Sequence, residues 1–313
     1  MKVYTDFNAL GNIKNPVLTI GTFDGVHIGH QKIIQRIKSE AEKIDGETVI
    51  FTFFPHPRLV LHPENNSLRM IQTQDEKIAN LERLGIDHLI IIPFTKEFSQ
   101  IEAEDFIKHF LYEKLGVKVV VVGYDHHFGR GRRGDLAMLR QYGEQFHYKV
   151  IEIPAQEIEE VNVSSTKIRN AILSGNIETA NLYLHEHFEM TGTVVKGNQL
   201  GRTIGFPTAN IRIDDDCKII PAIGIYIVRV KVNSEWYQGM LSIGKNPTVT
   251  TDEKIKIEVN IFNFSADIYG KTITVQFLKY LRDEKKLASV EALKQQLKED
   301  EKATLDYFDS HRQ

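Results

Sequence analysis

Apolar runs and helical patterns alternate over roughly the first 185 residues of the chain. The runs are VLTIGTF (17–23), TVIFTFF (48–54), HLIIIPF (88–94), VKVVVVG (117–123) and YKVIEIP (148–154). Each is continuously apolar, which is typical of parallel strands covered on both faces. Helical patterns fall between and after them, near 29–44, 75–84, 103–115, 135–146 and 166–174. The alternation predicts a doubly wound parallel sheet, with Gly175 placed to end the last helix.

After about residue 187 the pattern changes to period two. In 224–232 the apolar residues Tyr226, Val228, Val230 and Val232 alternate with Arg229 and Lys231. The segments 254–262 and 271–278 alternate in the same way, with turn residues between the segments. Short strands separated by turns predict an antiparallel barrel or sandwich, and a helical pattern follows over 289–308. We therefore expect two domains, 1–185 and 186–313, in a chain of 313 residues.

Composition narrows the class of protein. The net charge of −3 argues against bulk nucleic-acid binding, which usually needs a basic excess. The single cysteine, Cys217, rules out an intrachain disulfide and fits a reducing compartment as a bystander thiol. No apolar run reaches the ~18 residues of a membrane span, and the first residues have no apolar signal segment. We expect a cytoplasmic protein without nucleic-acid or membrane partners, as a monomer or weak homo-oligomer.

The first strand-to-helix junction, GTFDGVHIGHQ (21–31), has the residues of a phosphate site. A helix N-terminus offers free N–H groups and partial positive charge. Gly25 and Gly29 remove side chains where a phosphate or base must come close. His27 and His30 can point into one crevice and donate hydrogen bonds to phosphate oxygens. The alternative is an ordinary helix start with two incidental histidines.

Two later stretches also carry cations. The loop over 121–135 contains Arg130, Arg132 and Arg133 among glycines, which suits phosphate but equally suits a solvated charged loop. In VSSTKIR (163–169), Ser164 or Ser165 is a good helix N-cap. The same stretch, with its lysine and arginine, can instead clamp triphosphate oxygens.

A glycine-rich stretch, TGTVVKGNQLGRTIGFPTANI (191–211), opens the second half. It lacks the P-loop pattern, but backbone N–H groups in such a loop can approach phosphate. Thr208 and Asn210 face the same side of an extended segment and offer oxygen ligands that suit Mg²⁺. An ordinary turn is the alternative. Glu258 lies in a later predicted strand, where a glutamate is more often simply solvent-facing.

These motifs together resemble a known family. GTFDGVHIGHQ, FFPHP (53–57), GYDHHFG (123–129) and SSTKIR (164–169) are similar to the adenylyltransferase module of bacterial bifunctional riboflavin kinase/FAD synthetases. That module belongs to the nucleotidyltransferase superfamily with the HIGH signature. GRTIGFPTAN (201–210), PAIGIY (221–226), SIGKNPT (242–248), IEVNIFNF (257–264) and YGKTITVQFLKYLRDEKKL (269–287) resemble the riboflavin kinase signature in order. His126 departs from this pattern, because Phe is more usual there, and Asn263 and Leu287 are smaller departures.

The resemblance implies a fold and an activity. It implies a nucleotidyltransferase domain followed by a six-stranded kinase barrel with a terminal helix. The barrel would phosphorylate riboflavin to FMN, and the first domain would adenylylate FMN to FAD and release pyrophosphate. The substrates and products would be riboflavin, ATP, FMN and FAD, with Mg²⁺ as cofactor.

The resemblance also implies roles for individual residues. For ATP in the adenylyltransferase they are Gly21, Phe23, Asp24, Gly25, His27, His30, Ser164, Ser165, Thr166 and Arg169. For FMN they are Phe54, Pro55, His56, Pro57 and Asp125. For ATP in the kinase they are Lys196, Gly197, Gly201, Arg202, Gly205, Pro207, Thr208 and Asn246. Glu258 would be the base and, with Arg282, would bind riboflavin, while Thr208 and Asn210 would hold Mg²⁺.

Other functions explain less of the chain. An adenylyltransferase for another phosphate monoester leaves the 191–211 stretch unexplained. A flavin-binding regulator or RNA-binding protein would not need an intact set of chemical residues, and no aromatic–basic stripe favours RNA. A tRNA synthetase would need a KMSKS-type loop, which the sequence lacks.

Overall fold

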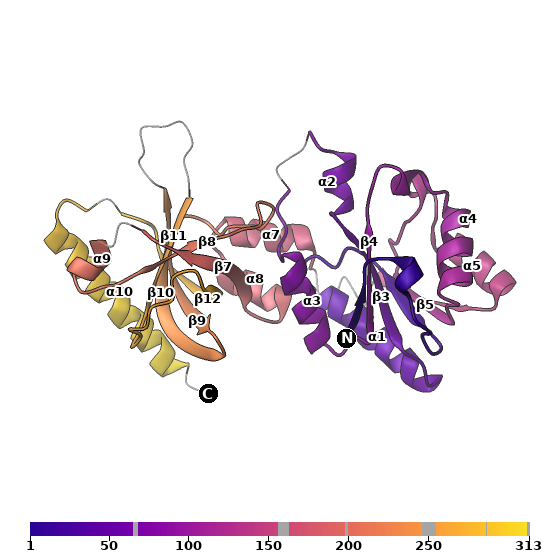
Figure 1. Ribbon diagram of the computed structural model, residues 1–313, viewed down its shortest axis with the longest axis horizontal. Coiled ribbons are helices and arrows are strands. Elements are labelled where there is room, and N and C mark those ends of the chain that lie inside the picture. Colours follow the sequence, from indigo (N-terminus) through magenta and orange to yellow (C-terminus); the bar gives the residue numbers. More distant parts are fainter. Residues whose placement is uncertain (65–67, 156–162, 198–199, 246–254, 286, 312–313) are drawn as a thin grey trace. The chain divides into compact units, whose positions relative to one another are not determined.

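The chain folds into two compact units, Met1–Ser165 and Thr166–Gln313. The computed structural model describes all residues except 65–67, 156–162, 198–199, 246–254, 286 and 312–313 (Figure 1). The spatial division falls earlier than our expected boundary at 185/186, because two helices of the second unit, α7 and α8, precede its barrel.

The first unit is built on a six-stranded sheet in which all paired strands are parallel, as the alternating pattern predicted. The order across the sheet is β1-β4-β3-β2-β5-β6. The strands are β1 (Lys2–Tyr4), β2 (Val17–Ile20), β3 (Thr48–Phe54), β4 (His88–Pro93), β5 (Val119–Gly123) and β6 (Lys149–Ile153). The short β1 has no counterpart among the runs we identified in the sequence.

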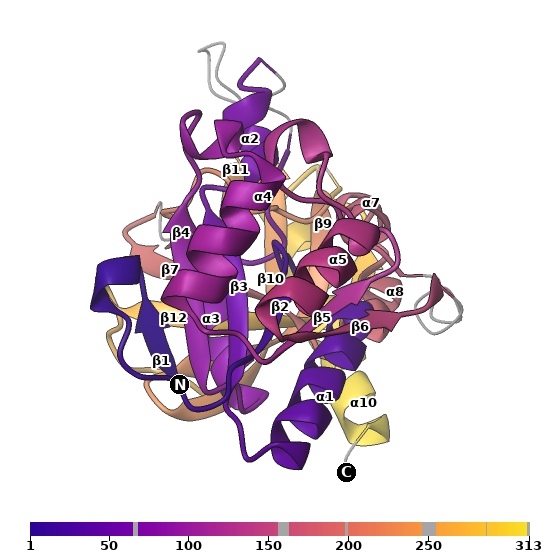
Figure 2. The same ribbon diagram turned by 90° about the vertical axis from the view of Figure 1, so that its right-hand side faces the viewer.

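Helices cover both faces of this sheet, which is why its strands are apolar without alternation. The main ones are α1 (Ile28–Lys43), α3 (Gln74–Arg83), α5 (Leu136–Phe146) and the π-helical η3 (Phe106–Lys114), which continues from α4 (Ala103–Asp105). One buried cluster joins alternate strand residues to α1 and α3, and the other joins the opposite set to η3 and α5. Figure 2 shows α4 and α5 in front of the sheet. Shorter pieces are η1 (Phe7–Ala9), α2 (Pro57–Leu61), η2 (Phe98–Gln100) and η4 (Arg130–Arg132).

The second unit contains a closed six-stranded barrel, in the order β10-β11-β8-β7-β12-β9, with every pair antiparallel. The strands are β7 (Phe188–Val195), β8 (Ala209–Arg212), β9 (Gly224–Val232), β10 (Glu235–Lys245), β11 (Ile255–Ile261) and β12 (Thr272–Arg282). The helices are α7 (Ser165–Leu173), α8 (Ile177–Leu184), α9 (Leu200–Thr203) and α10 (Val290–Ser310). The barrel and terminal helix that the resemblance implied are both present.

Helix α8, which follows α7, is joined to the barrel by hydrogen bonds. Between the two helices, Gly175 adopts a φ of 77° after the end of α7, as predicted from its place in the sequence. The Asn181 side chain on α8 donates to the Phe277 carbonyl at 2.8 Å and accepts from the Phe188 N–H at 2.7 Å. These two bonds join α8 to β12 and β7, so the helix belongs with the barrel.

The long helix α10 covers part of the outer face of the barrel. Val228, Val230 and Val232 are buried in the barrel, while Arg229 and Lys231 are exposed, as the period-two pattern predicted. Ile227 points outward yet is also buried, because Phe308 of α10 packs against it. No helix in the described part of the chain is both long and apolar enough to span a membrane.

Candidate functional sites

Three of the predicted motifs meet at one edge of the parallel sheet. GTFDG follows β2, FFPHP ends β3, and GYDHHFG follows β5. Because β2 lies between β3 and β5, the carboxyl ends of these strands are neighbours. The strand order reverses at this point, where open α/β sheets form their ligand crevice. The topology therefore gathers the candidate ATP and FMN residues around β2.

The turn after β2 brings the two histidines together. Phe23, Gly25 and Val26 all have positive φ, so the chain leaves the sheet after Ile20, earlier than the predicted end at Phe23. His27 is the N-cap residue of α1 and is 7% exposed. Its ring stacks on His30 with centroids 3.8 Å apart, and His30 also contacts the Phe23 ring. The predicted pair thus lies at a helix N-terminus, against the turn.

Hydrogen bonds from distant segments hold this turn in place. The buried Asp24 carboxylate accepts from the Ile71 N–H at 2.9 Å, and the Ser165 hydroxyl donates to the Asp24 carbonyl at 3.0 Å. The SSTKIR and GTFDG motifs therefore touch through Ser165. Thr166 and Arg169 belong to α7 in the second unit, so their role in holding triphosphate stays a prediction, as does that of Ser164.

Lys77 is a site residue that the sequence analysis missed. It lies on α3, is 7% exposed, and its Nζ donates to the Thr22 carbonyl at 3.1 Å. Burial lowers the pKa of Lys77 to about 8, and Asp24 opposes this shift. One signal was present: Lys77 precedes Leu81 by four residues on the apolar face of an amphipathic helix, where lysine is rare.

The His30 imidazole is uncharged at neutral pH. Burial, followed by the nearby His27 and Lys77, holds the pKa of His30 well below its usual range. A neutral imidazole carries one N–H donor and one acceptor nitrogen. In the described structure the buried Nδ1 of His30 has no hydrogen-bond partner. The role of His30 as a donor to phosphate stays a prediction, and the neutral ring would bring no positive charge of its own.

The two neighbouring motifs are more open. Phe54 and Pro55 are exposed, and the bond between them is cis. His56 caps α2 by accepting from the Arg58 N–H at 3.2 Å, and Pro57 is the first residue of that helix. Asp125 is exposed at the end of β5. These residues lie at the predicted edge, and their contacts to a flavin stay predictions.

The arginine-bearing loop after β5 is fixed in shape, which we did not anticipate. Phe128 and Gly134 pair through two backbone hydrogen bonds, and a Cβ on Gly129 would collide with Ala103. Arg130 forms an ion pair with Glu102 at 3.0 Å. Arg132 and Arg133 are exposed. A phosphate role for this loop stays a prediction.

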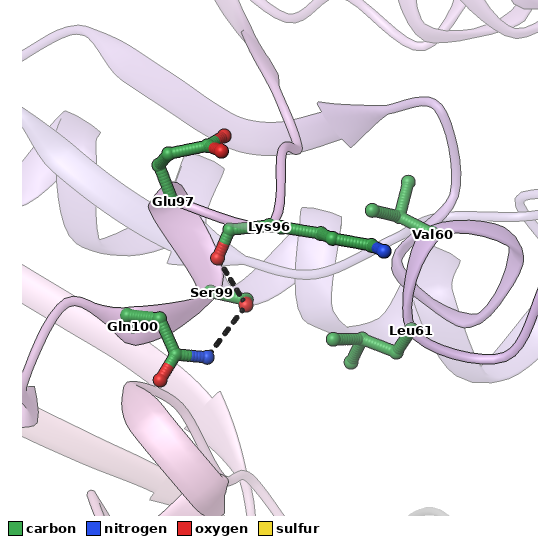
Figure 3. Close-up of a pocket in the computed structure, with 6 residues that line it drawn as sticks. All are labelled: Val60, Leu61, Lys96, Glu97, Ser99 and Gln100. Carbon is green, nitrogen blue, oxygen red and sulfur yellow. Dashed lines mark hydrogen bonds between the residues drawn. The ribbon is translucent and has the colours of Figure 1, made fainter.

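A cavity of about 350 Å³ lies between α2 and the segment 96–100. Figure 3 shows the Lys96 side chain reaching toward Val60 and Leu61, while Ser99 donates to the Lys96 carbonyl. No residue that we predicted to bind ATP or flavin lines this cavity. This cavity therefore does not coincide with the candidate residues that follow β2, β3 and β5.

The barrel register brings the kinase candidates together. Glu258 of β11 lies directly opposite Asn210 of β8 on one side and Ser242 of β10 on the other. Directly opposed residues share a face, so all three point the same way. The Thr208 hydroxyl donates to Glu258 Oε1 at 3.4 Å, and Lys256, which the sequence analysis missed, lies 2.9 Å from Oε2.

The glycine-rich stretch runs beside these residues. A Cβ on Gly197 would lie 2.1 Å from the Asn210 amide nitrogen, so any larger residue there would displace the Asn210 side chain. Gly205 has a φ of 90° before Pro207, whose carbonyl accepts from the buried Asn260 amide at 2.6 Å. Lys196, Gly201 and Arg202 lie within the same stretch, and Lys196 and Arg202 are exposed. The predicted ligand Asn246 lies outside the described residues.

Arg282 has a partner within the protein. Its Nε and one terminal nitrogen lie 2.7 and 2.5 Å from the two carboxylate oxygens of Asp300, which is 3% exposed. This bidentate pair joins β12 to α10. The predicted contact of Arg282 with riboflavin stays a prediction.

The donor set near Glu258 fits a magnesium ion. The described residues contain no group of three or more His, Cys, Asp or Glu side chains that could hold a metal. Thr208, Asn210 and Glu258 nevertheless offer only hard oxygen donors from neighbouring strands. Mg²⁺ typically takes one or two protein ligands and fills its remaining positions with water and phosphate, so this small set is sufficient.

Comparison with known proteins assigns the family. The family model described as FAD synthetase matches residues 11–167, and the one described as riboflavin kinase matches residues 184–308. A Listeria monocytogenes protein named bifunctional riboflavin kinase/FMN adenylyltransferase is 37% identical over 94% of this chain and 93% of its own length. The chain belongs to the bifunctional riboflavin kinase/FMN adenylyltransferase family.

Other members of this family match equally broadly. The Bacillus subtilis protein of the same name is 33% identical over 95% of this chain and 93% of its own length. Among solved structures, a Streptococcus pneumoniae protein titled as a macrolide-efflux protein is 36% identical. It covers 97% of this chain and 98% of its own, with a TM-score of 0.88. The bifunctional family therefore accounts for both units, in the order expected from the motifs.

Proposed function

We propose that the barrel unit phosphorylates riboflavin to FMN and that the α/β unit adenylylates FMN to FAD. The observation that carries this proposal is that two different family models match two parts of the chain, each with its own cluster of candidate residues. ATP supplies the γ-phosphoryl group for the first step and the adenylyl group for the second. FMN is thus the product of one unit and the substrate of the other.

In the kinase step, Glu258 is the general base. The ribityl 5′-hydroxyl gives its proton to the carboxylate as its oxygen attacks the γ-phosphorus of ATP, and ADP leaves. General-base catalysis of this kind contributes ~10²–10⁴-fold. Thr208 and Asn210 would hold Mg²⁺, which when bound neutralises phosphate charge as ATP reacts. The Gly197 approach to Asn210 keeps the backbone of the loop close to these ligands.

The adenylyl-transfer step needs no protein base. An oxygen of the FMN phosphate, already largely ionised at neutral pH, attacks the α-phosphorus of ATP and pyrophosphate leaves. The protein must align the two substrates and stabilise the charge that develops. His27, the neutral His30 and the free N–H groups at the start of α1 supply hydrogen-bond donors at that point.

Separate chemistry in two units makes the proposal testable with one protein. Pure protein is incubated with riboflavin or FMN plus ATP and Mg²⁺, and the flavins are separated by chromatography. Glu258→Gln should stop FMN formation while FAD formation from supplied FMN continues, and His30→Ala should do the reverse. Glu235→Gln, at an exposed position on β10, is the matched control and should change neither rate.

Two outcomes would refute this proposal. A parent protein that makes neither FMN nor FAD would overturn the function itself. Equal loss of both activities in Glu258→Gln and in His30→Ala would overturn the assignment of one reaction to each unit.

The single cysteine fits a reducing compartment, so we also propose that the enzyme is cytoplasmic. We propose that it acts on its small-molecule substrates riboflavin, FMN and ATP as a monomer or weak homo-oligomer.

A further inference from the structure

Lys77 is a buried cation that has no role in the two reaction steps proposed above. Its side chain comes from α3, which is neither the helix nor the turn that carries the predicted ATP residues. The Nζ reaches the Thr22 carbonyl at 3.1 Å, and the hydroxyl of Thr52, which is fully buried on β3, donates to the same oxygen at 3.2 Å. Removing an ammonium group from water is costly, so its burial here calls for compensating partners.

Two titratable groups that interact with Lys77 belong to the candidate ATP site. Asp24 faces it from the turn after β2 and stabilises its charged form. His30, on α1, is close enough for the charge of Lys77 to lower its pKa, and His27 stacks on the His30 ring. Since the pKa of Lys77 is lowered only to about 8, its amine is mostly protonated at neutral pH. A positive charge is therefore held within hydrogen-bond distance of the turn where phosphate is expected.

A hydrogen bond joins the segment just before α3 to the same turn. Thr73 and Glu76 form a reciprocal capping box, with their side chains bonded to each other's backbone N–H groups. Two residues before this box, the Ile71 N–H donates to the Asp24 carboxylate. Lys77 thus extends from a helix whose first turn is anchored, so its amine has a defined position relative to Thr22.

We propose that Lys77 is a positioning residue for adenylyl transfer, which holds the Gly21–Gly25 turn through the Thr22 carbonyl and adds a fixed positive charge beside His30. This inference rests on the proposed FAD-forming activity. Lys77 acts through the turn: it keeps the N-terminus of α1 and the two histidines aligned with the phosphates of ATP. Misplacing a catalytic group by about 1 Å can cost ~10²-fold in rate, which sets the size of the expected effect.

The test removes the ammonium and then returns it. Lys77→Ala leaves space for a small amine, and Lys77→Met keeps most of the packing volume but has no charge or donor. Each variant is assayed for FAD formation from FMN, with and without propylammonium, and with propanol as the uncharged analogue. The matched control is Lys38→Ala, because Lys38 also donates to a backbone carbonyl, that of Leu84 at 3.0 Å, at the far end of α3. FMN formation by the barrel unit normalises each assay for the amount of chain, and far-UV circular dichroism checks that the α/β unit is folded.

We expect kcat/KM for FAD formation to fall about 100-fold in Lys77→Ala and Lys77→Met. Propylammonium should recover at least about tenfold in Lys77→Ala and nothing in Lys77→Met, and propanol should recover nothing. Lys38→Ala should stay within about threefold of the parent. FAD formation by Lys77→Met within about threefold of the parent would overturn the inference, as would a defect in Lys77→Ala that the amine does not relieve. A parent that makes no FAD would instead overturn the proposed function.

Discussion

His126 should make the α/β unit sensitive to acid, and replacing it with phenylalanine should remove that sensitivity. Its Nε2 is buried and, within the described structure, has no hydrogen-bond partner, while its ring stacks on Phe128 with centroids 5.8 Å apart. Burial is the main cause that lowers the pKa of His126 to about 4, and the favourable charge of Asp125 only partly opposes it. Phenylalanine, which is more usual in this motif, would fill the space without a buried nitrogen.

The size of the effect follows from proton linkage. An unfolded histidine has a pKa of about 6.5, so the unfolded chain binds a proton that the folded chain does not accept until the pH nears 4. Stability is therefore intact above about pH 6.5 and is lost as the pH falls toward 4. From these two pKa values, the loss at pH 5 relative to pH 8 is about 2 kcal/mol for this one residue.

The assay is urea denaturation of the full chain at pH 8 and pH 5. Trp236 is the only tryptophan and lies in the barrel unit, so its fluorescence identifies the barrel transition. Far-UV circular dichroism follows both units, and the remaining transition belongs to the α/β unit. His126→Phe should lose about 2 kcal/mol less than the parent between the two pH values. At pH 8 it should also gain ~1 kcal/mol from removal of the unsatisfied nitrogen.

The neighbouring His127 gives a matched control, because it is exposed. His127→Gln should retain most of the pH dependence of the parent. His30 also titrates in this unit, but it is present in every variant, so its contribution cancels in the comparison. If His126→Phe and the parent lose the same free energy between pH 8 and pH 5, the reasoning about the buried nitrogen is wrong.

Two further predictions concern the barrel unit. Asp300→Ala leaves the mostly buried Arg282 guanidinium without its carboxylate partner, so it should lower the free energy of barrel unfolding by about 3–5 kcal/mol, as measured by Trp236 fluorescence. Adding Arg282→Met should restore much of this loss. An unchanged transition in Asp300→Ala would contradict the stabilising role of the pair. Gly197→Ala places a Cβ 2.1 Å from the Asn210 amide and should slow FMN formation by ~10²-fold while FAD formation from supplied FMN continues. Gly11→Ala, with open space at its Cβ, is the matched control, and full FMN formation by Gly197→Ala would show that the close approach is dispensable.

The local sequence was sufficient to predict those elements whose structure depends on a single segment. The apolar runs predicted five of the parallel strands, and 48–54 and 224–232 match their strands end to end. The motif GTFDGVHIGHQ predicted a turn, a helix start and two histidines close together, because residues three apart at a helix end are neighbours whatever the rest of the chain does.

Only the tertiary structure decided which distant residues meet. The position of Glu258 opposite Asn210 depends on strand register, which no single strand specifies. Lys77 reaches Thr22 from a helix 55 positions later in the chain, and the pairing of Arg282 with Asp300 depends on where α10 packs. Periodicity tells which face of an element is buried, but the partner on that face is set by packing between elements. That is why the chemistry of each unit could be predicted from motifs, whereas the residues that hold it in position could not.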